Sequence, residues 1–179
     1  YRKTEKVNNK IIIDFSKDRE EFKNFLNVYE ILLKANISIP KIYEINQEKY
    51  KIYMQDFGYD RFNIIYNKDN LYKLLKLAVD NIIVIQSETN LKDLKNLKEY
   101  TLRDLKIELK EFVTYYIPSK KVLSFPTSKF YKLWENIFYS QNYDMSNFVH
   151  KDFEFVNLFF LENYESYLKC GIIDFQSAF

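Results

Sequence analysis

The sequence predicts an α+β fold in which strands dominate the first third of the chain and helices dominate the rest. Two observations support this prediction. Four short segments typical of strands surround one amphipathic segment within residues 1–58, and longer segments with helical spacing follow before a last pair of strands. With 179 residues, the chain is long enough to bury a substantial core, either as one compact unit or as two small lobes around a cleft.

Two hairpins are expected in the first third of the chain. The segments 1–7 and 10–15 have the pattern of strands, and the two asparagines between them tolerate the positive φ of a tight hairpin turn. A second pair of strands, 41–45 and 50–55, surrounds a polar turn. With the amphipathic segment between the hairpins, the predicted order is strand, strand, helix, strand, strand.

Amphipathic patterns predict four helices. The first has Asp18 as its N-cap and is expected to end near Asn36. A capping box formed by Thr101 and Asp104 opens the third. The four helices are expected at residues 19–36, 70–87, 101–116 and around 130–138.

The chemically most informative stretch lies at 148–179. His150, Asp152 and Asn157 form the pattern H-x-D-x-x-x-x-N, and an apolar strand delivers Asp174 after it. A phosphotransferase needs a carboxylate to position a hydroxyl nucleophile and oxygen ligands to hold Mg²⁺ on the phosphates. Asp152 suits the first task, whereas Asn157 and Asp174 suit the second. His150 is expected to brace the loop by hydrogen bonding instead of transferring protons.

A predicted hairpin explains how Asn157 and Asp174 could come close together. The segments 158–161 and 167–173 have the pattern of short strands, and the polar residues 162–166 form the turn between them. Asn157 precedes the first strand and Asp174 follows the second. Both predicted metal ligands should therefore lie at the same end of the hairpin.

At these residues the sequence resembles a known family. The segments VHKDFEFVNLFFL and GIIDFQSA look like the catalytic loop and the metal-binding strand of the aminoglycoside phosphotransferases. The sequence IDFQ, in place of the D-F-G of protein kinases, looks like the branch containing N-acetylmuramate and N-acetylglucosamine anomeric kinases. The resemblance implies a protein-kinase-like fold in two lobes, truncated at both ends. It assigns residues 1–58 to a small lobe with the hinge and residues 59–179 to a helical large lobe.

The resemblance also implies roles for individual residues. The segment Gln55, Asp56 and Phe57, here called the hinge, would seat the adenine of ATP through its backbone. Arg2 or Lys3 would supply a cation to the phosphates, and Arg2 is preferred because it resembles an arginine of the branch. A Glu-x-x-x-Phe segment borders the sugar pocket in the branch and maps onto Glu108 and Phe112, although a solvated helix charge explains Glu108 better than a sugar contact does.

Several residues depart from the family pattern. The run Ile11-Ile12-Ile13-Asp14 places Asp14 where protein kinases carry a strand lysine. The chain has only two glycines, Gly58 and Gly171, so a glycine-rich phosphate loop is absent from these residues. Lys151 replaces the arginine that follows the motif histidine, and residues 154–156 replace a frequent His-Pro-Gly.

Bulk properties exclude other classes of function. The formal net charge of +2 gives no field that favours nucleic acid or a membrane surface. No apolar run approaches the roughly 20 residues that span a bilayer. One cysteine, Cys170, excludes an internal disulfide and is expected to be a buried, inert thiol, which fits a reducing cytoplasm.

The sequence therefore predicts a cytoplasmic, ATP- and Mg²⁺-dependent phosphotransferase that acts on a hydroxyl of a small molecule. An amino sugar of the N-acetylmuramate or N-acetylglucosamine type is the first expected acceptor, and an aminoglycoside is the next. A catalytically impaired nucleotide-binding regulatory module of the same fold is the alternative, supported by the missing strand lysine. A purely structural interaction domain is the third possibility.

Overall fold

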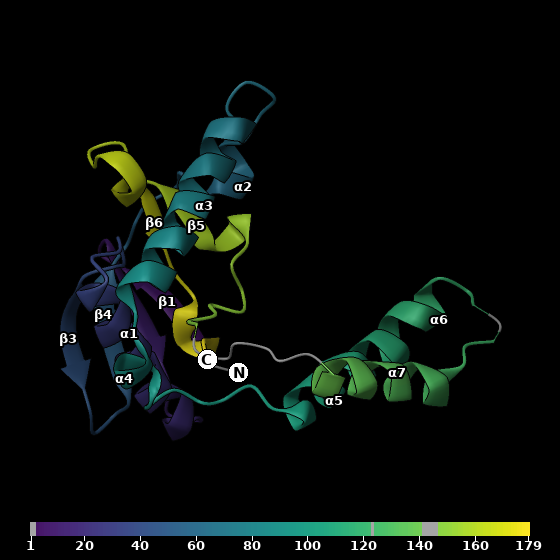
Figure 1. The fold of residues 1–179 in the computed structure, drawn as a ribbon. Helices are drawn as coiled ribbons and strands as arrows, with labels where there is room; N and C mark the ends of the chain where they lie inside the picture. The colour runs from purple at the N-terminus through teal and green to yellow at the C-terminus, as the bar shows by residue number, and fades with distance from the viewer. Residues whose placement is uncertain (1–2, 123, 141–146) are drawn as a thin grey trace. The chain divides into compact units, whose positions relative to one another are not determined.

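The structure is a computed structural model that describes residues 3–122, 124–140 and 147–179 (Figure 1). Its contacts divide the chain into two units. The first contains residues 1–97 and 146–179, and the second contains residues 98–145. In the described part of the chain, no helix is long and apolar enough to cross a membrane.

A four-stranded antiparallel sheet forms the beginning of the first unit. Its strands are β1 (Lys3–Val7), β2 (Lys10–Asp14), β3 (Ile42–Asn46) and β4 (Lys51–Gln55), in the order β1-β2-β4-β3. Asn8 and Asn9 have φ angles of 48° and 60° in the β1–β2 turn, as expected for a tight hairpin. Both predicted hairpins are confirmed.

Helix α1 (Arg19–Lys34) packs its apolar face against this sheet and against the end of the chain. The Asp18 carboxylate caps the helix by accepting from the Glu21 amide at 2.8 Å, which confirms the predicted N-cap. Phe25 lies 5.4 Å from Phe15 and 4.9 Å from Phe175, measured between ring centroids. Burying such a ring contributes about 1.5–3 kcal/mol. Phe25 therefore joins the sheet to the segment that follows Asp174.

The remainder of the first unit consists of short helices, one long helix and a hairpin. These elements are α2 (Phe62–Ile65), α3 (Leu71–Glu88), α4 (Leu91–Leu94), β5 (Leu158–Phe160) and β6 (Cys170–Ile172), with 3-10 turns η2 (Phe155–Asn157), η3 (Ser166–Lys169) and η4 (Phe175–Ser177). The β5–β6 hairpin is confirmed, but its second strand begins three residues later than predicted. The reason is Asn81 of α3, whose buried amide donates to the Tyr167 carbonyl oxygen at 2.7 Å and holds that segment as η3.

The second unit is helical. It contains α5 (Leu102–Glu111), the π-helical segment η1 (Phe112–Tyr116), α6 (Ile117–Ser119) and α7 (Thr127–Ser140). The predicted capping box is present, with Thr101 and Asp104 satisfying each other's backbone amides. The predicted helix does reach Tyr116, but its hydrogen-bond register widens at Phe112. An ion pair of 3.2 Å between Lys106 and Glu135 joins α5 to α7.

Candidate active site

The β5–β6 hairpin places the two predicted metal ligands at one end, as the sequence predicted. The Ile173 amide donates to the Asn157 carbonyl oxygen at 3.0 Å, one step beyond the Leu158–Ile172 pair of the ladder. Asn157 therefore lies opposite Ile173 at the end of the hairpin, and Asp174 is the next residue along the chain. Their side chains supply an amide oxygen and a carboxylate, the two kinds of oxygen that suit Mg²⁺.

The catalytic-loop segment folds tightly around the backbone of Asp152. Its carbonyl oxygen accepts from the Asn157 side-chain amide at 2.9 Å and from the Glu154 backbone amide at 3.0 Å. The side-chain nitrogen of the buried Asn157 thus donates to the loop, and its side-chain oxygen is the atom that could bind a cation. The same bonds fix the backbone from which the partly exposed Asp152 carboxylate projects.

Two residues of this region have a left-handed backbone. Lys151 has φ 73° and Asp174 has φ 64°. Such conformations are uncommon in residues with a side chain, and they cost free energy that the surrounding structure must offset. They cluster at active sites and ligand clamps. Their occurrence beside Asp152 and at Asp174 favours a functional use of this end of the hairpin.

His150 contacts the strand segment that precedes Asp174. Its ring is buried, and Nε2 lies 3.2 Å from the Ile173 carbonyl oxygen. Burial lowers the pKa of His150 to about 4, so the imidazole is neutral near pH 7 and Nε2–H donates to that carbonyl. Nδ1 has no hydrogen-bond partner among the described residues. This geometry supports the bracing role that the sequence predicted.

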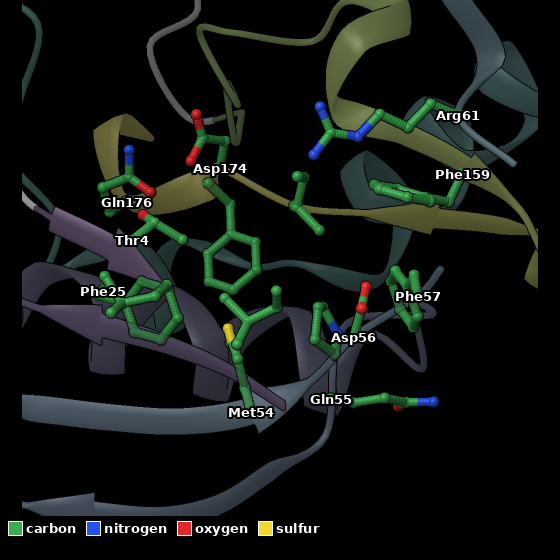
Figure 2. Close-up of a pocket in the computed structure, with 15 residues that line it drawn as sticks. Thr4, Phe25, Met54, Gln55, Asp56, Phe57, Arg61, Phe159, Asp174 and Gln176 are labelled. Atoms are coloured by element: carbon green, nitrogen blue, oxygen red, sulfur yellow. The ribbon is translucent and has the colours of Figure 1, made fainter. Parts of the chain in front are cut away.

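A pocket lies between the sheet and the hairpin end (Figure 2). The sheet contributes Ile11, Ile13 and Met54, and the other side contributes Phe159, Asp174 and Gln176. The predicted hinge, Gln55 to Phe57, forms part of the wall. The enclosed volume is about 110 Å³. Typical small-molecule sites enclose roughly 300–1,000 Å³, so this cavity would enclose only part of a nucleotide.

Two hinge side chains are engaged within the protein. The Gln55 side-chain oxygen accepts from the Lys41 amide at 3.3 Å. Burial opposes ionisation of Asp56, but hydrogen bonds from Lys6 and from the Gly58 amide outweigh it and keep the pKa of Asp56 below its usual value. The backbone N–H and C=O of Phe57 have no partner in the described part of the chain. Contacts to a base would therefore come from the Phe57 backbone.

The sheet lines the pocket mainly with apolar side chains beside Thr4, and the expected place of Asp14 needs correction. Asp14 pairs with Lys51 across the ladder, at 3.2 Å between their charged groups. Since side chains alternate along a strand, Ile13 and not Asp14 occupies the position that faces the pocket. No lysine of the described strands lines this pocket. Arg2, the predicted phosphate cation, lies outside the described residues.

Arg61 lines the pocket and was missed by the sequence analysis. Its guanidinium lies 5.1 Å from the centroid of the Phe159 ring, and its backbone forms an isolated antiparallel bridge with Phe159. Among the described residues that line the pocket, it is the one with a basic side chain. No motif surrounds it in the sequence, because its position depends on the distant strand β5.

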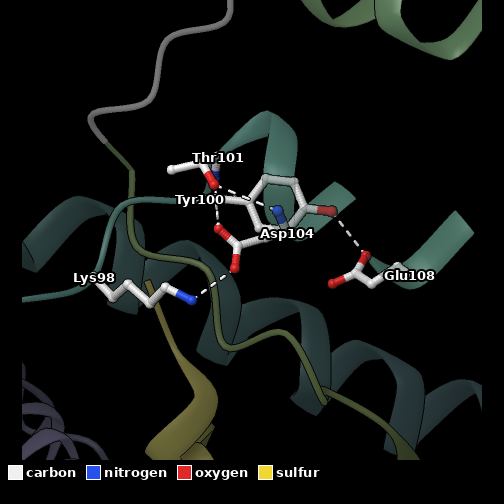
Figure 3. A network of polar contacts seen from close by, with 5 residues as sticks. All are labelled: Lys98, Tyr100, Thr101, Asp104 and Glu108. Atoms are coloured by element: carbon white, nitrogen blue, oxygen red, sulfur yellow. Dashed lines mark hydrogen bonds and ion pairs between the residues drawn. The ribbon is translucent and has the colours of Figure 1, made fainter. Parts of the chain in front are cut away.

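Glu108, the predicted substrate-binding residue, belongs to the second unit. Its carboxylate accepts from the Tyr100 hydroxyl at 2.8 Å, beside the capping box of α5 (Figure 3). Burial, with the neighbouring Glu108 carboxylate, raises the pKa of Tyr100. This hydrogen bond gives Glu108 a local structural role. The structure does not place Glu108 relative to Asp152, so its substrate contact stays a prediction.

Comparison with known proteins supports the fold. No protein-family model and no curated protein matches the sequence. A solved structure, that of a ternary complex of streptomycin, ATP and APH(2")-IIa, is similar with a TM-score of 0.53 and 16% sequence identity. The match covers 99% of this chain and 66% of that chain, just under two thirds of its length. The neighbour is an aminoglycoside phosphotransferase, so the chain has a mixed helix-and-sheet fold that resembles a small-molecule kinase.

Proposed function

We propose that this chain belongs to an ATP-dependent phosphotransferase that acts on a hydroxyl of a small molecule. The observation that carries the proposal is that two predicted parts, the hinge and Asp174, line one pocket. Asp174, in a left-handed backbone conformation, lines the same pocket as the hinge residue Phe57. Asn157 lies beside Asp174 across the hairpin end. In this proposal, the predicted lobes 1–58 and 59–179 meet at this pocket.

Asn157 and Asp174 would hold Mg²⁺. Magnesium is usually bound by one or two protein carboxylates together with phosphate and water oxygens, so a pair of protein ligands is sufficient. This agrees with the described residues, in which no three His, Cys, Asp or Glu side chains gather into a metal site. The bound ion would neutralise part of the phosphate charge. The protein's contribution is to keep the two oxygen donors adjacent before the nucleotide arrives.

Asp152 is the proposed general base. Its carboxylate would accept the proton of the acceptor hydroxyl as that oxygen bonds to the γ-phosphorus of ATP, while the bond from phosphorus to the β–γ bridging oxygen breaks and ADP leaves. The hydrogen bonds on the Asp152 carbonyl oxygen hold its backbone still. A fixed backbone helps to keep the carboxylate within reach of the hydroxyl.

An amino sugar of the N-acetylmuramate or N-acetylglucosamine type is the proposed acceptor, with an aminoglycoside as the other candidate. Streptomycin in the neighbour's complex makes a small-molecule acceptor plausible for this fold. The π-helical segment that starts at Phe112 adds support near Glu108, since such segments occur frequently at functional sites. Glu108 is retained as the proposed substrate contact.

One observation favours the regulatory alternative. Among the described residues, the sheet lines the pocket with Thr4, Ile11, Ile13 and Met54 and with no lysine, whereas an active kinase of this fold usually holds the phosphates with a cation. A nucleotide-binding module without turnover would need no such cation. The two functions differ in whether a hydroxyl receives phosphate.

The test is phosphate transfer from radiolabelled ATP to N-acetylated amino sugars and aminoglycosides, with Mg²⁺ present and then chelated. The phosphotransferase predicts a labelled acceptor that is lost on chelation. ATP binding without transfer to any acceptor of the panel would favour the regulatory module. Absence of both binding and transfer would refute the proposal.

A further inference from the structure

We propose that Arg61 binds the phosphate chain of the nucleotide and supplies a cation on the hairpin side of the pocket. This inference rests on the proposed function, because it assumes a nucleotide in the pocket. Its starting point is the charge of the pocket. The ionisable groups among the described lining residues are the carboxylates Asp56 and Asp174 and the guanidinium of Arg61. Without Arg61, the charged side chains among these described lining residues would be carboxylates alone.

The backbone around Arg61 is fixed to the hairpin side of the pocket. Its bridge with Phe159 attaches it to strand β5, and the adjacent Phe160 amide donates to the Asp60 carbonyl oxygen at 2.8 Å. Residues 55–57 of the hinge lie a few positions before it in the chain. Arg61 therefore connects the hinge to the strand that leads from Asn157. Its side chain starts from a well-defined place.

The side chain extends into the pocket, where it forms no direct ion pair with any described residue but contributes to the lowered pKa of Asp56. Figure 2 shows Arg61 running along the hairpin side of the pocket, above Phe159 and in the direction of Asp174. The guanidinium carbon of Arg61 lies 5.1 Å from the centroid of the Phe159 ring, within the range of a cation–π contact. Such a contact leaves the N–H groups of the guanidinium available as donors.

The chemistry of this arrangement fits a phosphate. A guanidinium donates two parallel hydrogen bonds to phosphate oxygens, and it does so best when its plane is already oriented. Asp174, as a ligand of Mg²⁺, would hold the outer phosphates from the other side. The phosphate chain would then lie between Arg61 and Asp174, and the base would lie against the hinge.

A structural role is the competing explanation, since Arg61 could serve only to cover Phe159. The chain offers a matched control for this role. Lys73 places its ammonium 5.0 Å from the ring centroid of Phe160, the next residue of β5, but does not line the pocket. Lys73→Gln therefore removes a cation over the same strand without touching the proposed phosphate site.

The test compares the dissociation constants of ATP, ADP and adenosine for wild type, Arg61→Gln, Arg61→Lys and Lys73→Gln by calorimetry. A lost charge-assisted hydrogen bond corresponds to about a 10- to 150-fold loss of affinity. Arg61→Gln should show this loss for ATP and ADP but not for adenosine. Arg61→Lys should be weakened less, and Lys73→Gln should equal wild type.

The outcomes separate this inference from the proposed function. ATP binding that is unchanged in Arg61→Gln, or an equal loss for adenosine, would overturn the phosphate contact while leaving the nucleotide site intact. Wild type that binds neither ATP nor adenosine would overturn both. If Arg61→Gln fails to fold, Arg61→Lys decides the question, since loss of the bidentate fork should still weaken ATP relative to adenosine.

Discussion

The ring of the hinge residue Phe57 packs directly on Gly171 of strand β6. A Cβ added at Gly171 would lie 2.7 Å from a ring carbon of Phe57, closer than real Cβ atoms come to their neighbours. The strand before Asp174 and the hinge are therefore in contact, and glycine is required for this approach. The contact fixes the distance between the hinge, where the base would bind, and the strand that leads to Asp174, where Mg²⁺ would bind.

Gly171→Ala should consequently destabilise the protein and weaken nucleotide binding together. Overpacking of this kind typically costs about 1–3 kcal/mol, which lowers Tm by roughly 2–12 °C in a chain of this size. Thermal unfolding and adenosine titration measure the two effects. In a Phe57→Leu background the same substitution should cost less, because the smaller side chain can retreat. An equal cost in both backgrounds would show that Phe57 is not the obstacle.

Asp174→Ala should remove the Mg²⁺-dependent part of ATP affinity and leave adenosine binding unchanged. The substitution deletes a hard oxygen ligand at the hairpin end without touching the hinge. Calorimetric titration of ATP with and without Mg²⁺ measures this. Asp80→Ala is the control, since Asp80 forms an exposed ion pair with Lys76 on α3. Mg²⁺ dependence that survives in Asp174→Ala would contradict the assignment.

Asn81→Leu should destabilise the first unit by about 1–3 kcal/mol. The substitution leaves the Tyr167 carbonyl oxygen without the donor that holds η3, and an unsatisfied buried acceptor costs about that much. Urea unfolding followed by circular dichroism measures the change. Ser87→Ala, which removes an exposed hydroxyl of the same helix, should have little effect. Equal stability of the Asn81 variant and wild type would contradict this account of the shortened strand.

Cys170 should react very slowly with thiol reagents until the protein unfolds. Burial raises the pKa of its thiol to about 12, far above the roughly 8.5 of a free cysteine. Because the folded pKa is raised, the folded state loses stability relative to the unfolded state as pH rises from about 9 toward 12. Reaction of the protein with an aromatic disulfide reagent at pH 8, followed at increasing urea concentrations, measures the reactivity of the thiol. Rapid labelling of native protein would contradict this burial.

Local signals explain which parts of the fold could be predicted from the sequence. The asparagine turn, the Asp18 cap and the capping box at Thr101 depend on residues a few positions apart, and all three are present in the structure. The late start of β6 could not be predicted, because Asn81 of a distant helix sets it. Longer-range contacts override local propensity here.

The same distinction applies to the candidate site. The proximity of Asn157 and Asp174 follows from a hairpin, which is a local structure. Asp14 was matched to the position of the kinase lysine, but a shift by one residue exchanges the two sides of a strand, and Ile13 instead of Asp14 meets the pocket. Arg61 was missed because the ring that it contacts, Phe159, lies far along the chain.

The role of Asp152 is the central claim, and phosphate transfer by Asp152→Asn tests it most directly. The substitution keeps the size of the side chain but removes the base, and general-base contributions are typically about 10²- to 10⁴-fold. ATP affinity, measured in parallel, should stay within about twofold of wild type, and Glu154→Gln, which removes the exposed charge two residues away, should keep full activity. The account predicts a loss of transfer of that size in Asp152→Asn alone. Transfer at the wild-type rate in Asp152→Asn would contradict it.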